Sequence, residues 1–247
     1  MDKVTRRSFV TTVGAASVVP AVALLSPAAQ AAVPANAPTA SQPAKSTYLF
    51  FNAEEVLFIE AACERLIPAD EAGPGAIGAG VCNFLDRQLG GAWGAGERLY
   101  RSGPWAAGTP SQGYQLPFTP AELFHTALRA IIRDLEKRGA VFAELAPDAQ
   151  DGYLKSLETG TSELDGVPAP VFFEMLLRMT VEGFFSDPVY GGNRNMVAWR
   201  MIGFPGAYAD YYEAIDRHGV KFEREPMSLA EDGQGHVHVH ENIPASL

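Results

Sequence analysis

Residues 170–185 constrain the fold most, because a helix over this range would be apolar on nearly every side. Proline at the start of the segment suits the first turn of a helix. The charged exceptions, Glu174, Arg178 and Glu182, repeat every four residues. Such a row is typical of solvated ion pairs, although in a subunit it could instead face a partner. We expect a helix of this composition to lie at the centre of a helical domain.

Helix-start signals mark two further segments. Asn52 with Glu55 three residues later is a capping-box pattern, and apolar residues at helical spacing follow it. Thr119 and Glu122 repeat the pattern, with Pro120 at the first helical position and a broad apolar stripe behind it.

Strand signals are few, and a shorter helix is expected over residues 148–158. The sequence therefore predicts a mainly α protein. We expect a single helical domain over residues 48–218, with long irregular loops and an extended C-terminal tail over residues 219–247.

The first 31 residues have the pattern of a twin-arginine export signal. Arg6 and Arg7 precede an uncharged run, and Ala29-Gln30-Ala31 is a small-x-small cleavage site. An ordinary export signal or an uncleaved anchor is the alternative. Residues 32–47 are rich in Ala, Pro and Ser and predict a disordered linker. The pattern predicts a periplasmic protein that the twin-arginine translocase exports already folded.

Residues 183–206, here called the glycine–aromatic stretch, lack the periodicity of a regular element. Gly191 and Gly192 permit backbone angles that are closed to other residues. Ordered, irregular segments rich in large side chains often bind something. The stretch could also be a structural loop packed on its own domain. We expect it to contact a partner through the following residues: Tyr190, Gly191, Gly192, Asn193, Arg194, Trp199, Phe204 and Pro205.

A second long segment, residues 90–118, contains Gly, Pro and several aromatic residues. Loops of this length are uncommon in compact domains unless they have a function. We expect this loop to face a partner or act as a lid, with Trp105 among its contacts.

The chain offers few residues for chemistry. Cys63 and Cys82 could form a disulfide in an oxidising compartment, could remain buried thiols, or one could pair with another chain. His236, His238 and His240 alternate along an extended segment and could bind zinc or copper. Residues 73–78 match G-x-G-x-x-G, but a helix rather than a strand precedes them, so a connecting turn is favoured over a nucleotide site.

No motif of a hydrolase, a metalloprotease or a P-loop enzyme occurs, and no catalytic residues are expected. The net charge of −10 argues against a nucleic-acid partner. Export of a folded chain without a cofactor site favours a protein that travels with a cofactor-bearing partner. The alternatives are a stand-alone periplasmic metal-binding protein that uses the three histidines, and an independent oxidoreductase.

The string from Ser186 to Gly206 also resembles a known signature. Its Ser-Asp-Pro-Val-Tyr-Gly-Gly-Asn-Arg-Asn-Met run and its Met-Ile-Gly-Phe-Pro-Gly end are similar to the gluconate 2-dehydrogenase subunit 3 family. The segment from Leu66 to Ala76 and Phe84-Leu-Asp86 also match, and the resemblance extends from about residue 48 to about residue 217.

The resemblance implies a non-catalytic small subunit of a membrane-associated dehydrogenase complex. The implied partner is a large flavin-dependent subunit of the glucose–methanol–choline type, which holds FAD. A multihaem cytochrome c subunit would be a third component. The small subunit would support maturation and export of the large one, and the family supplies no catalytic residues to transfer.

Overall fold

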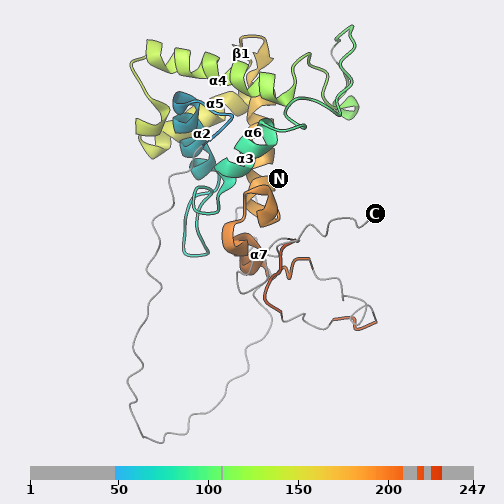
Figure 1. The fold of residues 1–247 in the computed structure, drawn as a ribbon. Helices are drawn as coiled ribbons and strands as arrows, with labels where there is room; N and C mark the ends of the chain where they lie inside the picture. Colours follow the sequence, from blue (N-terminus) through green and yellow to red (C-terminus); the bar gives the residue numbers. More distant parts are fainter. Residues whose placement is uncertain (1–47, 107, 208–215, 220–223, 230–247) are drawn as a thin grey trace, which may run out of the picture. The chain divides into compact units, whose positions relative to one another are not determined.

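The structure is a computed structural model that describes residues 48–106, 108–207, 216–219 and 224–229. The predicted signal, the linker, the tyrosine-rich segment after residue 207 and the three tail histidines lie outside these residues. The described part is mainly α, as the sequence predicts (Figure 1). Its α-helices are α2 (Ala53–Leu66), α3 (Val81–Leu89), α4 (Pro120–Lys137), α5 (Pro147–Thr159), α6 (Ala169–Phe185) and α7 (Val197–Ile202).

Short elements connect these helices. The 3-10 turns are η1 (Pro110–Gln112), η2 (Phe142–Glu144), η3 (Pro188–Tyr190) and η4 (Arg194–Met196). The two-residue strands β1 (Glu163–Leu164) and β2 (Val167–Pro168) form an antiparallel hairpin. Asp165 and Gly166 both have positive φ at its tip, as a tight two-residue hairpin turn requires.

Both predicted capping boxes form. The Asn52 side chain accepts hydrogen bonds from the backbone N–H groups of Glu54 and Glu55 at the start of α2. At the start of α4, Thr119 Oγ1 accepts from the Glu122 N–H at 3.1 Å, while Glu122 Oε2 accepts from the Thr119 N–H at 2.7 Å. The local sequence therefore sets where these helices begin.

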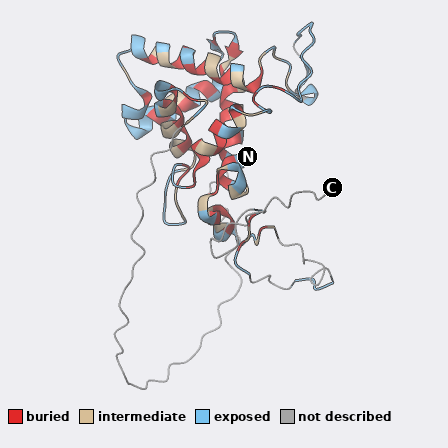
Figure 2. Cartoon of the chain, in the orientation of Figure 1, coloured by how far each residue is buried: buried red, intermediate tan, exposed pale blue. Residues whose placement is uncertain are grey.

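Helix α6 packs against α2, α3, α4 and α5, so the segment predicted to be central is central (Figure 2). Phe172 is fully buried, with its ring 5.4 Å from that of Phe124 on α4. The prediction was incomplete in one respect, because Leu177, Val181 and Phe185 are all more than a third exposed. The apolar character of α6 therefore includes an outward-facing part near its C-terminal end.

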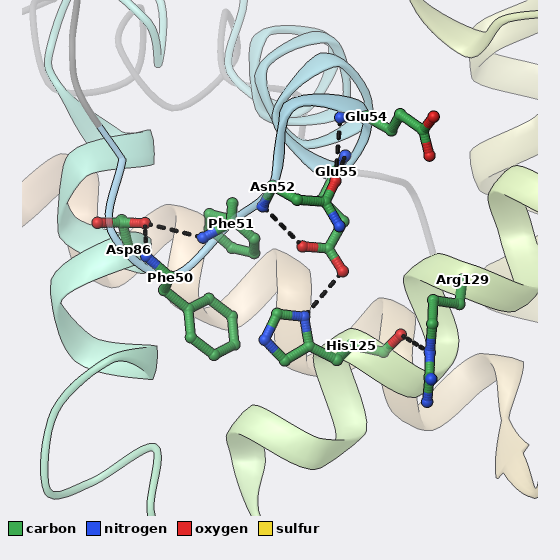
Figure 3. Close-up of polar contacts among 8 residues, drawn as sticks. All are labelled: Phe50, Phe51, Asn52, Glu54, Glu55, Asp86, His125 and Arg129. Carbon is green, nitrogen blue, oxygen red and sulfur yellow. Dashed lines mark hydrogen bonds and ion pairs between the residues drawn. The ribbon is translucent and has the colours of Figure 1, made fainter.

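The chain enters the domain over a cluster of buried carboxylates (Figure 3). Asp86 of α3 accepts three backbone hydrogen bonds, from the N–H groups of Leu49 at 2.9 Å, Phe50 at 2.9 Å and Phe51 at 3.1 Å. Glu55, which is 1% exposed, accepts from the Asn52 N–H and bonds to the Nδ1 of His125 on α4 at 2.8 Å. These contacts attach the entry segment to α3, α2 and α4.

Part of the predicted tail does not extend away from the domain. Residues 227–229 return to the glycine–aromatic stretch, where Gly206 and Met227 form a parallel β-bridge. The Leu229 N–H donates to Asp187 Oδ2 at 2.8 Å, and Ser228 is buried. No sequence pattern predicts this contact, because backbone pairing between two irregular segments depends on tertiary placement.

Candidate partner-binding surface

The glycine–aromatic stretch adopts a strained but ordered backbone. It contains η3, η4 and the short helix α7, with left-handed residues between them. Asn193, Asn195 and Met196 have φ values of 44°, 56° and 54°, which non-glycine residues adopt infrequently. Such residues persist only where surrounding contacts hold them. The stretch is therefore shaped, as expected, and it also contains three short regular elements that the sequence did not predict.

Asn193 supplies two of the contacts that hold this backbone. Its side chain is fully buried, its Nδ2 donates to the Ser186 carbonyl at 2.9 Å, and its Oδ1 accepts from the Ala198 N–H at 2.8 Å. The amide thus joins the end of α6 to the start of α7. We expected Asn193 to be displayed to a partner, and this placement was wrong, because both ends of the side chain are used inside the chain.

Trp199 also points inward. It is 6% exposed, its indole N–H donates to the Phe185 carbonyl at 2.8 Å, and its ring lies edge-on to that of Phe204 at 5.1 Å. A partner cannot reach most of this side chain, so its expected role as an anchor is corrected to a role in fixing α7 against α6.

The two adjacent glycines allow close backbone approach. A Cβ on Gly192 would lie 2.0 Å from the Gly183 carbonyl oxygen of α6, which leaves no room for a side chain. Gly191 has a φ of 102°, and its carbonyl oxygen lies 3.0 Å from where a Cβ on Gly80 would stand. The Arg194 N–H donates to the Ala79 carbonyl at 2.9 Å. The stretch is therefore attached both to α6 and to the glycine-rich turn before α3.

Large apolar side chains are exposed around this scaffold. Tyr190 is 50% exposed and Phe204 is 45% exposed, so both are accessible, and their contact with a partner stays a prediction. Pro205 is half-buried beside Phe204. The sequence prediction missed further exposed residues of α6, η3 and α7, which are Val181, Phe185, Val189 and Ile202. Buried Thr180 and Phe184 directly precede the exposed Val181 and Phe185, so only the packing of α6 reveals which of these residues face outward.

The loop over residues 90–118 forms a second exposed region. Trp105 is 40% exposed and Tyr100 is 82% exposed, consistent with the expected accessibility of this loop. Tyr114 instead anchors the loop, because its hydroxyl donates to the Phe118 carbonyl at 2.7 Å. Burial raises the pKa of Tyr114 to about 12. The loop is thus attached at its C-terminal end, and the exposed Tyr100 and Trp105 precede this end in the chain.

The two cysteines are buried free thiols on α2 and α3. Cys63 Sγ lies 3.4 Å from Thr180 Oγ1 of α6. A hydrogen bond with the Cys63 thiol, together with burial, raises the pKa of Cys82 well above its usual range. Cys63 and Cys82 therefore do not form the disulfide that the sequence allowed. They match the alternative of two buried thiols of low reactivity.

The glycine-rich turn before α3 is not built for a phosphate. Glu64 of α2 accepts hydrogen bonds from the N–H groups of Ala69 at 3.1 Å and Ile77 at 3.0 Å. A Cβ on Gly75 would lie 2.2 Å from the same carboxylate. Because the carboxylate occupies the turn, a phosphate would meet both a negative charge and amides that are already bonded. The connecting-turn interpretation is therefore the correct one.

Within the described ranges, no group of three or more His, Cys, Asp or Glu residues could hold a metal ion. His236, His238 and His240 lie outside those ranges, so the proposed metal site on them stays a prediction. Among the helices that the structure describes, none has the length and apolar character needed to cross a bilayer.

The model of the family described as gluconate 2-dehydrogenase subunit 3 matches residues 53–206. The match begins at the first residue of α2 and ends with the glycine–aromatic stretch. No curated protein and no solved structure matches the chain. Since the matched region covers more than half of the chain, and includes both the helical core and the stretch, the chain belongs to the gluconate 2-dehydrogenase subunit 3 family.

Proposed function

We propose that this chain is a non-catalytic accessory subunit that binds the large, flavin-dependent subunit of a dehydrogenase complex. The observation that carries the proposal is the exposed Tyr190, which stands on a strained scaffold within the family-matched region. Strained backbone that the surrounding structure holds in place is commonly found at binding sites. Exposed aromatic residues are frequent anchors of protein interfaces. Family membership supports a dehydrogenase as the partner.

In the proposed complex, the cofactors would belong to the other subunits. FAD would reside in the large subunit, of the glucose–methanol–choline type, and haem c in a third, cytochrome subunit. This chain would supply the folded surface that binds the large subunit. Docking of this surface would stabilise the large subunit and support its maturation.

Export forms the second part of the proposal. Arg6 and Arg7 give the leader its twin-arginine pattern. A chain that carries this signal and binds the large subunit in the cytoplasm would take the folded flavoprotein across the membrane with it. The complex would then function in the periplasm at the inner membrane.

The docking role can be tested by coexpressing the two subunits and measuring exported, flavin-loaded dehydrogenase. Tyr190→Ser and Ile202→Ser remove exposed apolar side chains of the proposed surface, and each should sharply reduce the yield. Val141→Ser is the matched control, because Val141 is also exposed but lies at the start of η2, between α4 and α5 in the chain. Equal yields from all three variants, or normal yields without this chain, would refute the docking role.

The export role has a separate test. Replacing both Arg6 and Arg7 by lysine should leave the docked complex assembled in the cytoplasm. Flavin-loaded dehydrogenase found in the periplasm at the normal level would show that export does not depend on this leader.

A further inference from the structure

Arg87 of α3 and Arg194 of η4 each lie beside one of two facing glycines, Gly191 and Gly80. A Cβ on Gly191 would lie 3.0 Å from Arg87 Cδ and 3.2 Å from its Nε. A Cβ on the facing Gly80 would lie 3.7 Å from an Nη of Arg194. The Gly191 carbonyl oxygen faces Gly80, so the two arginine side chains lie next to the same pair of glycines.

Neither guanidinium has an ion-pair partner among the residues that the structure describes. Most other arginines in this part of the chain pair with a carboxylate, for example Arg65 with Asp151 at 2.5 Å and Arg133 with Asp165 at 2.6 Å. Arg87 is exposed and Arg194 is half-buried. In a chain with a net charge of −10, this is a local concentration of uncompensated positive charge.

The carboxylates nearest to Arg87 and Arg194 in the sequence already accept hydrogen bonds from backbone N–H groups. Asp86, next to Arg87, accepts its three backbone hydrogen bonds from residues 49–51. Asp187, which precedes η3, accepts from the N–H groups of Val189 at 3.0 Å and Leu229 at 2.8 Å. Both carboxylates therefore hold backbone in place, and neither bonds to the two arginines.

We propose that Arg87 and Arg194 bind carboxylate side chains of the dehydrogenase subunit. Guanidinium groups match carboxylates in a bidentate geometry, and complementary charge fixes the register of an interface. Tyr190 directly precedes Gly191, so the two cations lie at the edge of the docking surface that we propose. The partner chemistry is thus an acidic segment beside an apolar contact. This inference rests on the proposed function and adds the recognition chemistry to it.

The test measures the dissociation constant between the full chain and the flavin-containing dehydrogenase subunit purified with it from the native host. Arg87→Gln and Arg194→Gln should each weaken binding by about tenfold at low salt. The double variant should also lose most of the salt dependence that the unmodified pair shows between about 50 mM and 300 mM NaCl. Lys137→Gln in the last turn of α4 is the matched control and should change the constant by less than about twofold.

Arg87→Lys and Arg194→Lys keep the charge without the planar geometry and should bind with intermediate affinity. If a glutamine variant fails to fold, these lysine variants and the salt dependence of the unmodified pair decide the question. Unaltered affinity and salt dependence in a folded double variant would overturn the inference while leaving the docking role intact. Absence of binding by the unmodified chain would instead overturn the docking role, and the inference with it.

Vesicles containing phosphatidylglycerol distinguish another source of negative charge. The full chain should bind them no better than the double variant does. Vesicle binding that requires both arginines, with unchanged affinity for the dehydrogenase, would overturn the inference in favour of a lipid headgroup.

Discussion

Asn193 offers the sharpest test of how the docking surface is held. Asn193→Ala removes the donor to the Ser186 carbonyl and the acceptor for the Ala198 N–H. Leaving a buried polar group unpaired costs about 1–3 kcal/mol. The Ala198 N–H would bear this cost in full, whereas water can reach the carbonyl of the half-buried Ser186 and reduce its share. The two losses together therefore cost about 2–4 kcal/mol. Alanine at a φ of 44° adds about 1 kcal/mol. The expected loss in the free energy of unfolding is therefore about 3–5 kcal/mol.

Thermal unfolding followed by circular dichroism measures this loss. For a chain of this size, each 1 kcal/mol lowers Tm by about 2–4 °C, so Asn193→Ala should lower it by about 6–20 °C. Asn83→Ala is the control, because Asn83 is a half-buried asparagine of α3 whose side chain makes no hydrogen bond to any residue that the structure describes. It should cost less than about 0.5 kcal/mol.

Asn193→Asp separates the hydrogen bonds from the packing, because the side chain keeps its shape. One oxygen can still accept from the Ala198 N–H, but the other would face the Ser186 carbonyl. Burial and this carbonyl raise the pKa of the aspartate in the folded state above its unfolded value. Its destabilisation should therefore be small near pH 3 and grow as the pH rises above about 4.

Two results would refute this account of Asn193. One is a Tm for Asn193→Ala within about 2 °C of the unmodified protein, with unchanged hydrogen exchange at the Ala198 amide. The other is an Asn193→Asp variant that is equally destabilised at acidic and neutral pH. Either result would mean that other contacts, and not this amide, hold the stretch on α6.

Two further predictions concern titration and thiol chemistry. The backbone hydrogen bond from Thr119 lowers the pKa of Glu122 below its ordinary value of 4.5. The Glu122 carboxylate therefore stabilises the folded state above pH 4.5, and this stability is lost as the pH falls through the lower pKa of the folded state. Glu122→Gln should weaken this acid dependence in urea titrations, and an unchanged pH profile would contradict the assignment. Cys63 and Cys82 should react with a thiol reagent only at the rate of unfolding, because both are buried; fast labelling of the folded chain would show that they are accessible.

The sequence by itself determined the helical class and several helix boundaries. The capping boxes at Asn52 and Thr119 are local, since each side chain bonds to backbone within three residues of itself. The apolar segment over residues 170–185 likewise identified the central helix. Such signals can be read from the sequence because they depend only on spacing along the chain.

Only the tertiary structure decided which residues of the glycine–aromatic stretch face outward. Trp199 and Tyr190 are both large aromatics in the same segment, yet the first is buried against Phe185 and the second is exposed. No sequence pattern predicted Arg87 as part of the docking surface. It belongs there only because α3 packs beside Gly191. Exposure and charge pairing depend on neighbours that are distant in the chain, and local patterns contain no information about them.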